Sequence, residues 1–312
     1  MSKKRKVITL CVILVAVALL AGAGFSAYRY FSDPITYTVR DTLPDGEGKR
    51  ARVILLGGQS NAVGCSRDEY LREKVPEEQY AEYANGYDHI YINYLSGENR
   101  SEGFVKCSVA QGEKGGFFGP ELGLAEMLNE LYPNETFFII KCAWGGTNLY
   151  EQWLSPSSDG RTGELYRSFI AFVESSIDYL TDKNYDVSIE GMCWMQGESD
   201  SFSITTANEY AEHLEFFIKD VRNAFSEYAA EDGIAFIDAT IAENSPYWVY
   251  FDAVNRSKAA VAERSPLNCL VDTRELSVAE EPKEEPDLAH YDSLSELRLG
   301  HLFGEGLRAY LQ

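Results

Sequence analysis

The sequence has few basic residues for its acidic content. Lysine and arginine number 28 against 49 aspartate and glutamate residues, which gives the 312-residue chain a formal net charge of −21. Such a chain would repel a polyphosphate backbone, so we expect no nucleic-acid partner. Hydrophobic residues make up 45% of the chain and aromatic residues 13%, which is enough for a sizeable buried core.

Paired cysteine motifs are missing as well. Of the six cysteines, Cys11 lies in an apolar N-terminal run, and the other five are scattered without CxxC spacing: Cys65, Cys107, Cys142, Cys193 and Cys269. This pattern predicts neither a disulfide framework nor a zinc site, and we expect no metal and no cofactor. The sequence also lacks the GxxxxGK[ST] phosphate loop and the GxSxG nucleophile elbow.

The N-terminus carries a membrane-targeting pattern. A basic cluster, Lys3–Lys6, precedes the uncharged run Val7–Phe25, which is close to the ~20 residues that cross a bilayer. We therefore expect a cytoplasmic basic tail and a single-pass signal anchor over residues 1–31, with the rest of the chain outside the cell membrane. The alternative is cleavage at Ala21–Ala23, which would release a secreted protein.

Residues 32–51 are polar and contain Asp33-Pro34 and the turn-rich stretch Pro44–Gly48, which is typical of a stalk. We expect the catalytic domain to cover residues 52–312.

Compact apolar runs alternate with amphipathic ones in this domain. The expected strands are Val53–Leu56, His89–Tyr94, Phe137–Cys142, Ile189–Met195 and Ile234–Ile237. The expected helices are Gly119–Leu131, Glu164–Leu180, Ala207–Tyr228, Tyr247–Arg264 and Leu294–Leu311. This alternation predicts an α/β fold with a parallel sheet covered by helices on both faces. Ligands of such sheets bind at the carboxyl ends of the strands.

The first candidate site follows the first strand. In the segment Leu55–Gly64, two glycines lead directly into Ser60. Glycines let the backbone turn sharply and leave the next side chain uncrowded, which suits a nucleophile that attacks a carbonyl. The alternative is a Gly-rich turn in which Ser60 caps a helix.

A second segment, Trp144–Leu149, follows the strand Phe137–Cys142. The backbone N–H groups of Gly145 and Gly146 are free to point at an anion, as a donor of an oxyanion hole must.

A third segment, Trp194–Asp200, also ends a strand. The amide of Gln196 could donate a hydrogen bond to a developing oxyanion, while Glu198 and Asp200 could orient neighbouring groups or cap the next helix. We favour the interpretation that Glu198 is a structural carboxylate, or one that supports other site residues without contacting the substrate.

The fourth segment contains Asp287 and His290, three positions apart on a turn ahead of the last helix. A carboxylate at this spacing can hold one ring nitrogen and leave the other to deprotonate a hydroxyl. The remaining histidines are placed less well, because His89 falls in a strand pattern and His213 and His301 fall in helical patterns.

Taken together, the four segments resemble the blocks of the SGNH hydrolase superfamily and, more closely, its sialate O-acetylesterase branch, carbohydrate esterase family six. The residues that carry the resemblance are Gly58-Gln59-Ser60-Asn61, Trp144-Gly145-Gly146-Thr147, Trp194–Ser199 and Asp287–His290, together with Phe118–Gly123. The resemblance covers residues 52–312.

This resemblance implies a flavodoxin-like, three-layer α/β/α sandwich and metal-free removal of acetyl groups from carbohydrates. Carried over residue by residue, Ser60 is the nucleophile, His290 the base and Asp287 its orienter. The Ser60 N–H, the Gly146 N–H and the Gln196 side chain become the oxyanion donors, with the choice between Gly145 and Gly146 left open.

Specificity must then come from the alcohol side of the ester, where Tyr150, Trp153 or Trp248 could stack on a sugar ring or simply belong to the core or surface. The competing interpretations of function are a non-catalytic surface protein that binds carbohydrate, and an esterase that acts on peptidoglycan or lipid esters.

Overall fold

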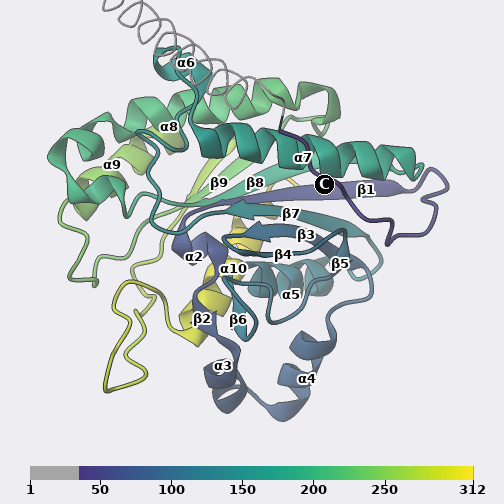
Figure 1. Cartoon of the computed structure of the whole chain (residues 1–312), viewed down its shortest axis with the longest axis horizontal. Coiled ribbons are helices and arrows are strands. Elements are labelled where there is room, and N and C mark those ends of the chain that lie inside the picture. The colour runs from purple at the N-terminus through teal and green to yellow at the C-terminus, as the bar shows by residue number, and fades with distance from the viewer. Residues whose placement is uncertain (1–34, 312) are drawn as a thin grey trace, which may run out of the picture. The chain divides into compact units, whose positions relative to one another are not determined.

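A computed structural model of the chain describes residues 35–311. Its centre is one sheet with six parallel strands (Figure 1). Their order across the sheet is β10 (Asn268–Val271), β9 (Ala235–Ala239), β8 (Asp186–Met195), β1 (Arg50–Gly58), β7 (Phe137–Ala143) and β3 (Ile90–Ser96). Two short strands, β4 (Asn99–Arg100) and β5 (Val105–Lys106), pair antiparallel with β3.

Helices cover both faces of this sheet (Figure 1). One layer contains α7 (Glu164–Asp182), α8 (Ile204–Ala224) and α9 (Phe251–Ala262), and the other contains α5 (Glu121–Leu131) and α10 (Ser293–Leu307). The α/β/α sandwich expected from the sequence is thereby confirmed. It forms because each strand carries a continuous apolar run, which two layers of helices remove from water.

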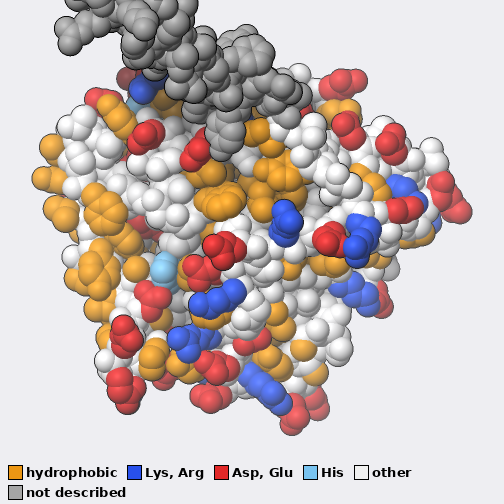
Figure 2. Space-filling model, in the orientation of Figure 1, with side chains coloured by type: hydrophobic (Ala, Val, Ile, Leu, Met, Phe, Trp, Pro, Cys, Tyr) orange, Lys and Arg blue, Asp and Glu red, His pale blue; other side chains and the backbone are white. Residues whose placement is uncertain are grey.

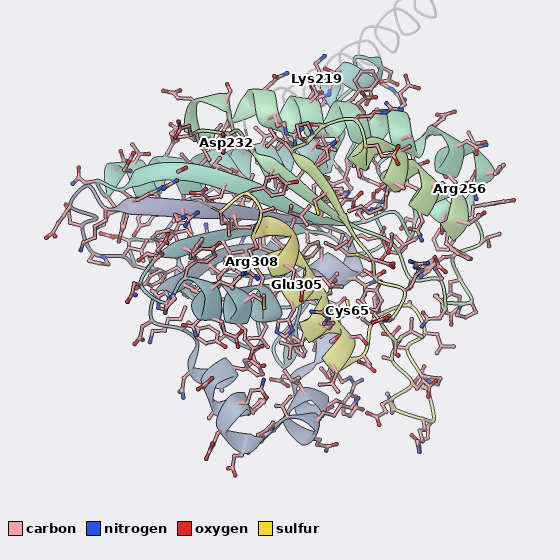
Figure 3. The ribbon with its side chains drawn as sticks, turned by 180° about the vertical axis from the view of Figure 1, so that it is seen from behind. Cys65, Lys219, Asp232, Arg256, Glu305 and Arg308 are labelled. Carbon is pink, nitrogen blue, oxygen red and sulfur yellow. The ribbon has the colours of Figure 1, made fainter. Side chains whose placement is uncertain are left out.

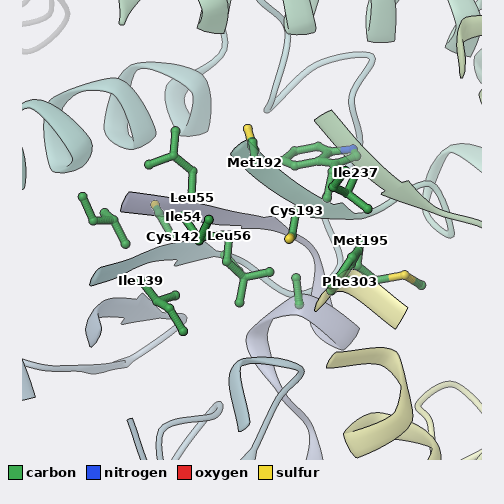
Figure 4. Close-up of a cluster of buried hydrophobic side chains, with 14 of the residues drawn as sticks. Ile54, Leu55, Leu56, Ile139, Cys142, Met192, Cys193, Met195, Ile237 and Phe303 are labelled. Carbon is green, nitrogen blue, oxygen red and sulfur yellow. The ribbon is translucent and has the colours of Figure 1, made fainter. Parts of the chain in front are cut away.

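Side chains from several strands and α10 form the core between these layers (Figure 4). Leu55 of β1, Met192 of β8, Ile237 of β9 and Phe303 of α10 are all fully buried in this core.

Helices α5 and α10 approach unusually closely. A Cβ added to Gly123 would lie 2.0 Å from the carbonyl oxygen of Leu297, and one added to Gly300 would lie 2.2 Å from that of Pro120. The missing side chains let the two backbones touch. Asp292 caps α10 by accepting a hydrogen bond from the Ser295 N–H at 2.8 Å, which fixes where the preceding segment enters the helix.

All five expected strands and all five expected helices are present, with shifted ends. The helix expected at 247–264 begins at Phe251, and the one expected at 207–228 ends at Ala224, followed by a 3₁₀ turn at Ser226–Tyr228. Strand β10 was not anticipated. Nor were the short elements α2 (Ser60–Val63), β2 (Ser66–Arg67), α3 (Asp68–Lys74), α4 (Glu77–Asn85), β6 (Phe117–Phe118), α6 (Pro156–Asp159) and the 3₁₀ turn Asp200–Phe202.

The segment expected to be a stalk makes definite contacts from Tyr37 onward. The Tyr37 and Ser168 hydroxyls are 2.5 Å apart, Leu43 is buried, and the Tyr179 hydroxyl accepts a hydrogen bond from the Leu43 N–H at 2.9 Å. Residues 37–49 therefore lie partly along α7, and the domain limits stay a prediction.

Within residues 35–311, no helix combines the length and the apolar character needed to cross a membrane. The anchor expected over residues 1–31 lies outside the described residues.

Candidate active site

Three of the four candidate segments begin at the same level of the sheet. The last residue of β1, Gly58, pairs with Ala143 of β7 and with Met195 of β8. After β1 the chain builds one side of the sheet and then returns to build the other, so β1 lies at the switch point where ligands of open α/β sheets bind.

The turn after β1 places Ser60. Gly58 has φ +138°, and a Cβ there would lie 1.9 Å from the carbonyl oxygen of Met195, so only glycine fits. The next residue, Gln59, donates its N–H to that same oxygen at 2.8 Å. Ser60 then begins α2, and its side chain lies at the edge of the buried region at 9% exposure.

The far end of α2 is held by a buried ion pair. Lys141 of β7 donates to the carbonyl oxygen of Val63 at 2.8 Å and to Glu121 Oε2 at 2.6 Å, and both charged side chains are fully buried. A buried ammonium needs such partners, so the short helix that carries Ser60 is fixed at both ends.

The glycine segment after β7 faces Ser60. A Cβ added to Gly145 would lie 3.6 Å from the Ser60 Cβ, while Gly146 has φ +68° with open space around it. The Trp144 N–H donates to the carbonyl oxygen of Gly58 at 3.1 Å and ties the two segments together. Both glycines line the cleft above Ser60.

Asp287 and His290 form a hydrogen-bonded pair. His290 Nδ1 lies 2.7 Å from Asp287 Oδ2, and the Ala289 N–H donates to Asp287 Oδ1 at 3.2 Å. The bond to His290 holds the pKa of the Asp287 carboxyl below its usual value. Burial of the imidazole opposes protonation, but Asp287 and the Cys65 thiol outweigh it and raise the pKa of His290 above the usual value.

The segment that carries His290 is tied to the Ser60 segment. The Tyr291 N–H donates to Asn61 Oδ1 at 3.3 Å, and the Ser66 hydroxyl donates to the carbonyl oxygen of Tyr291 at 2.7 Å. Ser60 and His290 line the same cleft, although Ser60 Oγ makes no hydrogen bond to the ring in the described structure. Catalytic hydrogen bonds often tighten only when substrate binds.

Glu198 contacts Asn61 and not the histidine. Asn61 Nδ2 donates to Glu198 Oε1 at 2.8 Å, and burial raises the pKa of the Glu198 carboxyl. Through Asn61, this carboxylate supports the backbone beside His290.

Gln196 lies behind the cleft wall. It is fully buried, and its Nε2 lies 2.5 Å from Asp200 Oδ2, 3.1 Å from the Thr147 carbonyl oxygen and 3.3 Å from Gln59 Oε1. The Tyr210 hydroxyl donates to its Oε1 at 3.0 Å. This placement does not suit the direct oxyanion contact expected for Gln196, because its two amide hydrogens already face three acceptors.

Asp200 holds the backbone at the end of the glycine segment in place. Its carboxylate accepts from the N–H groups of Leu149 and Tyr150 at 3.0 and 3.3 Å, besides the bond from Gln196. Burial raises the pKa of Asp200 to about 6 against the effect of these donors.

The cleft above Ser60 has a volume of about 900 Å³. Gln59, Cys65, Trp248 and Phe202 also contribute to its wall. A second cleft of about 680 Å³ shares Cys65 and His290 but does not include Ser60. Among the described residues, no group of three or more His, Cys, Asp or Glu could hold a metal ion.

A family model for carbohydrate esterases, described as sialic acid-specific acetylesterase, matches residues 50–309. The chain belongs to this family. It is therefore an esterase that removes O-acetyl groups from carbohydrates. A comparison with curated proteins gives no match.

Several solved structures have a similar fold. A protein from Arabidopsis thaliana aligns with a TM-score of 0.62 at 18% identity, covering 86% of this chain and all of that one. NanS aligns with a TM-score of 0.60 at 14% identity, covering 86% and 98%. A carbohydrate acetylesterase from Xanthomonas citri aligns with a TM-score of 0.60 at 15% identity, covering 83% of this chain and 56% of that one.

Two features of this carbohydrate esterase's cleft escaped the sequence analysis. Cys65, which belongs to none of the four candidate segments, is half-buried beside His290 and lies next to the N-terminal part of α10 (Figure 3). No sequence pattern pointed to Phe202, because its place in the cleft wall depends on contact with Trp248, 46 positions later in the chain. The centroids of the two rings are 5.5 Å apart.

Proposed function

We propose that Ser60, His290 and Asp287 form the catalytic triad of this esterase and that the reaction passes through an acetyl-enzyme. The observation that carries the proposal is the Asp287–His290 pair at 2.7 Å, whose histidine lines the same cleft as the serine on the tight turn after β1. Because Asp287 accepts from Nδ1, the ring leaves Nε2 as the basic atom.

In the first step, Ser60 Oγ forms a bond to the acetyl carbonyl carbon while His290 takes the hydroxyl proton. The carbonyl electron pair moves onto its oxygen, where the N–H groups of Ser60 and Gly146 stabilise the negative charge. When the intermediate collapses, the sugar oxygen leaves with the proton from His290. Water then repeats the sequence on the acetyl-enzyme and releases acetate.

The alcohol side of the substrate should meet the aromatic part of the cleft wall. Trp248 and Phe202 line it with ring planes tilted by 54°, and Phe202 is 57% exposed. Hydrophobic side chains gather on the end of the molecule where α9 lies (Figure 2). An exposed aromatic face beside a nucleophile suits the apolar face of a sugar ring.

The other aromatic candidates lie elsewhere. Trp153 is fully buried in the core, where its indole N–H donates to Thr147 Oγ1 at 2.8 Å. Tyr150 packs edge-on against His213, at a centroid distance of 5.6 Å.

Assays on a panel of acetylated sugars test this function. We expect acetate release from an acetylated sialic acid, acetylated xylan or another acetylated glycan, and we expect Ser60→Ala to lower turnover by orders of magnitude while the fold stays intact. Activity near that of the unmodified chain in a folded Ser60→Ala variant would remove Ser60 from the mechanism. Turnover of peptidoglycan or lipid esters alone would shift the substrate class.

We further propose that the domain acts outside the cell membrane, anchored through residues 1–31. The basic cluster and apolar run at the N-terminus support this location. Fractionation of cells that produce the full chain should find it in membranes until detergent is added. Recovery of the intact chain in the cytosol would contradict the proposal, and release of a shortened chain would indicate cleavage.

A further inference from the structure

The residue before the nucleophile, Gln59, is held in an unusual way. Its Oε1 faces three donors at once: the Ser199 N–H at 3.2 Å, and the Gly197 N–H and Gln196 Nε2, both at 3.3 Å. Gln59 is only 2% exposed, yet it forms part of the cleft wall.

These contacts determine which end of the amide points inward. A backbone N–H can only donate, so the atom that faces Gly197 and Ser199 must be the amide oxygen and not the nitrogen. The Gln59 Nε2 group therefore points away from these donors. In the described structure this Nε2 group makes no hydrogen bond to the protein, and it is not fully buried.

The geometry points to Gln59 Nε2 as a side-chain donor of the oxyanion hole, an inference that rests on the function proposed above for Ser60. Its neighbour Ser60 carries the attacking oxygen, and Gly145 faces Ser60 from the opposite segment. An amide N–H in this wall would meet the negative oxygen that develops in the transition state, where such a donor is most effective.

This assignment also gives Gln196 a physical role. Its amide donates to Gln59 Oε1, while Asp200 Oδ2 and the Tyr210 hydroxyl hold Gln196 from behind. Gln196 is thus a positioning residue, and the chain Asp200–Gln196–Gln59 fixes the direction of the free Nε2 group. Preorganised donors stabilise charge without reorganising during the reaction.

The substitution Gln59→Glu tests the proposal in the full chain. A glutamate keeps an oxygen for all three donors but removes the N–H that the oxyanion would use. We expect kcat for an acetyl ester to fall by about 10²–10³-fold with little change in KM, since the contact is made mainly in the transition state. If Gln59 is merely structural, kcat should stay within a few-fold.

Gln152→Glu is the matched control, because Gln152 Oε1 also accepts a backbone N–H, that of Asn148 at 3.0 Å, but Gln152 is not part of the cleft wall. This variant should keep its activity. If Ser60→Ala is inactive while Gln59→Glu is fully active, the oxyanion assignment fails and the proposed nucleophile stands. If Ser60→Ala stays active, the proposed mechanism fails first.

A measurement on the unmutated chain covers the case in which Gln59→Glu does not fold. The side-chain N–H resonances of Gln59 should move strongly when an alkylboronic acid forms a tetrahedral adduct with Ser60, and those of Gln152 should not. Adduct formation without a change at Gln59 would overturn the assignment.

Discussion

Asp287 and Glu198 are both carboxylates close to the His290 segment, but they hold different atoms. Asp287 accepts directly from the ring nitrogen at 2.7 Å, whereas Glu198 accepts from the Asn61 amide at 2.8 Å. The first contact sets the charge and orientation of the imidazole, and the second sets the position of the backbone that carries it.

This difference predicts unequal effects of two isosteric substitutions. Asp287→Asn should lower kcat by about 10³–10⁴-fold, by analogy with serine-protease triads, because the imidazolium loses its counter-charge. Glu198→Gln should cost less than about tenfold, because an amide oxygen can still accept from Asn61. Steady-state kinetics on both folded variants decides the matter, and a large loss at Glu198 with little at Asp287 would reassign the acid.

The pH profile gives Asp287→Asn a second readout. The base must be neutral, so activity falls as the pH drops through the His290 pKa. Asp287 raises that pKa, and removing its charge should move the acidic limb of kcat/KM to lower pH. A limb that stays in place would show that another group controls it.

The role of a single residue could be predicted where the residues next to it in the sequence form a recognisable pattern. Ser60 follows two glycines, and Asp287 precedes His290 by three positions, so the sequence itself indicated roles for them. The Gln59–Gln196 and Asn61–Glu198 contacts each join residues 137 positions apart, and no local pattern predicts such pairs.

At the scale of elements, the turn between β1 and α2 depends on close packing of backbones. We expect Gly58→Ala to lower the free energy of unfolding by more than about 2 kcal/mol, because the new Cβ would overlap the Met195 carbonyl oxygen. Gly48→Ala is the control, since Gly48 has φ +77° but nothing within 4 Å, and it should cost about 1 kcal/mol. Equal losses in urea unfolding would show that backbone conformation alone matters at Gly58.

Elements with strong apolar patterns were predicted, and weakly buried ones were not. In α3 and α4, just one residue each is buried, Leu71 and Tyr83, which is too little for a recognisable amphipathic pattern. Strand β10 has four residues, of which Val271 alone is buried, so its apolar signal is short as well.

At the scale of the whole molecule, residues 37–51 contribute to the folded body. A fragment that begins at Tyr37 should be more stable than one that begins at Arg52, by about 2 kcal/mol or more, because the shorter one loses buried Leu43 and the first two residues of β1. Urea denaturation of both fragments checks this. Equal midpoints and slopes would indicate that residues 37–51 act as a plain linker.

The switch in strand order around β1 brings together segments that lie more than 200 positions apart in the chain. The sequence predicted the layers and the order of the segments, because those follow from periodicity and from the resemblance. It did not predict that Gln196 would contact Gln59 from the side away from the cleft. That contact depends on how far along its strand each side chain lies, which no sequence pattern encodes.

The central claim is that Ser60 carries the acetyl group during turnover. Acid quenching within the first turnover of an acetyl ester, followed by peptide mass spectrometry, should find one acetyl group on the peptide that contains Ser60. The Ser60→Ala variant should show none. Turnover without any acetylated peptide, or acetylation of Cys65 in place of Ser60, would contradict the account.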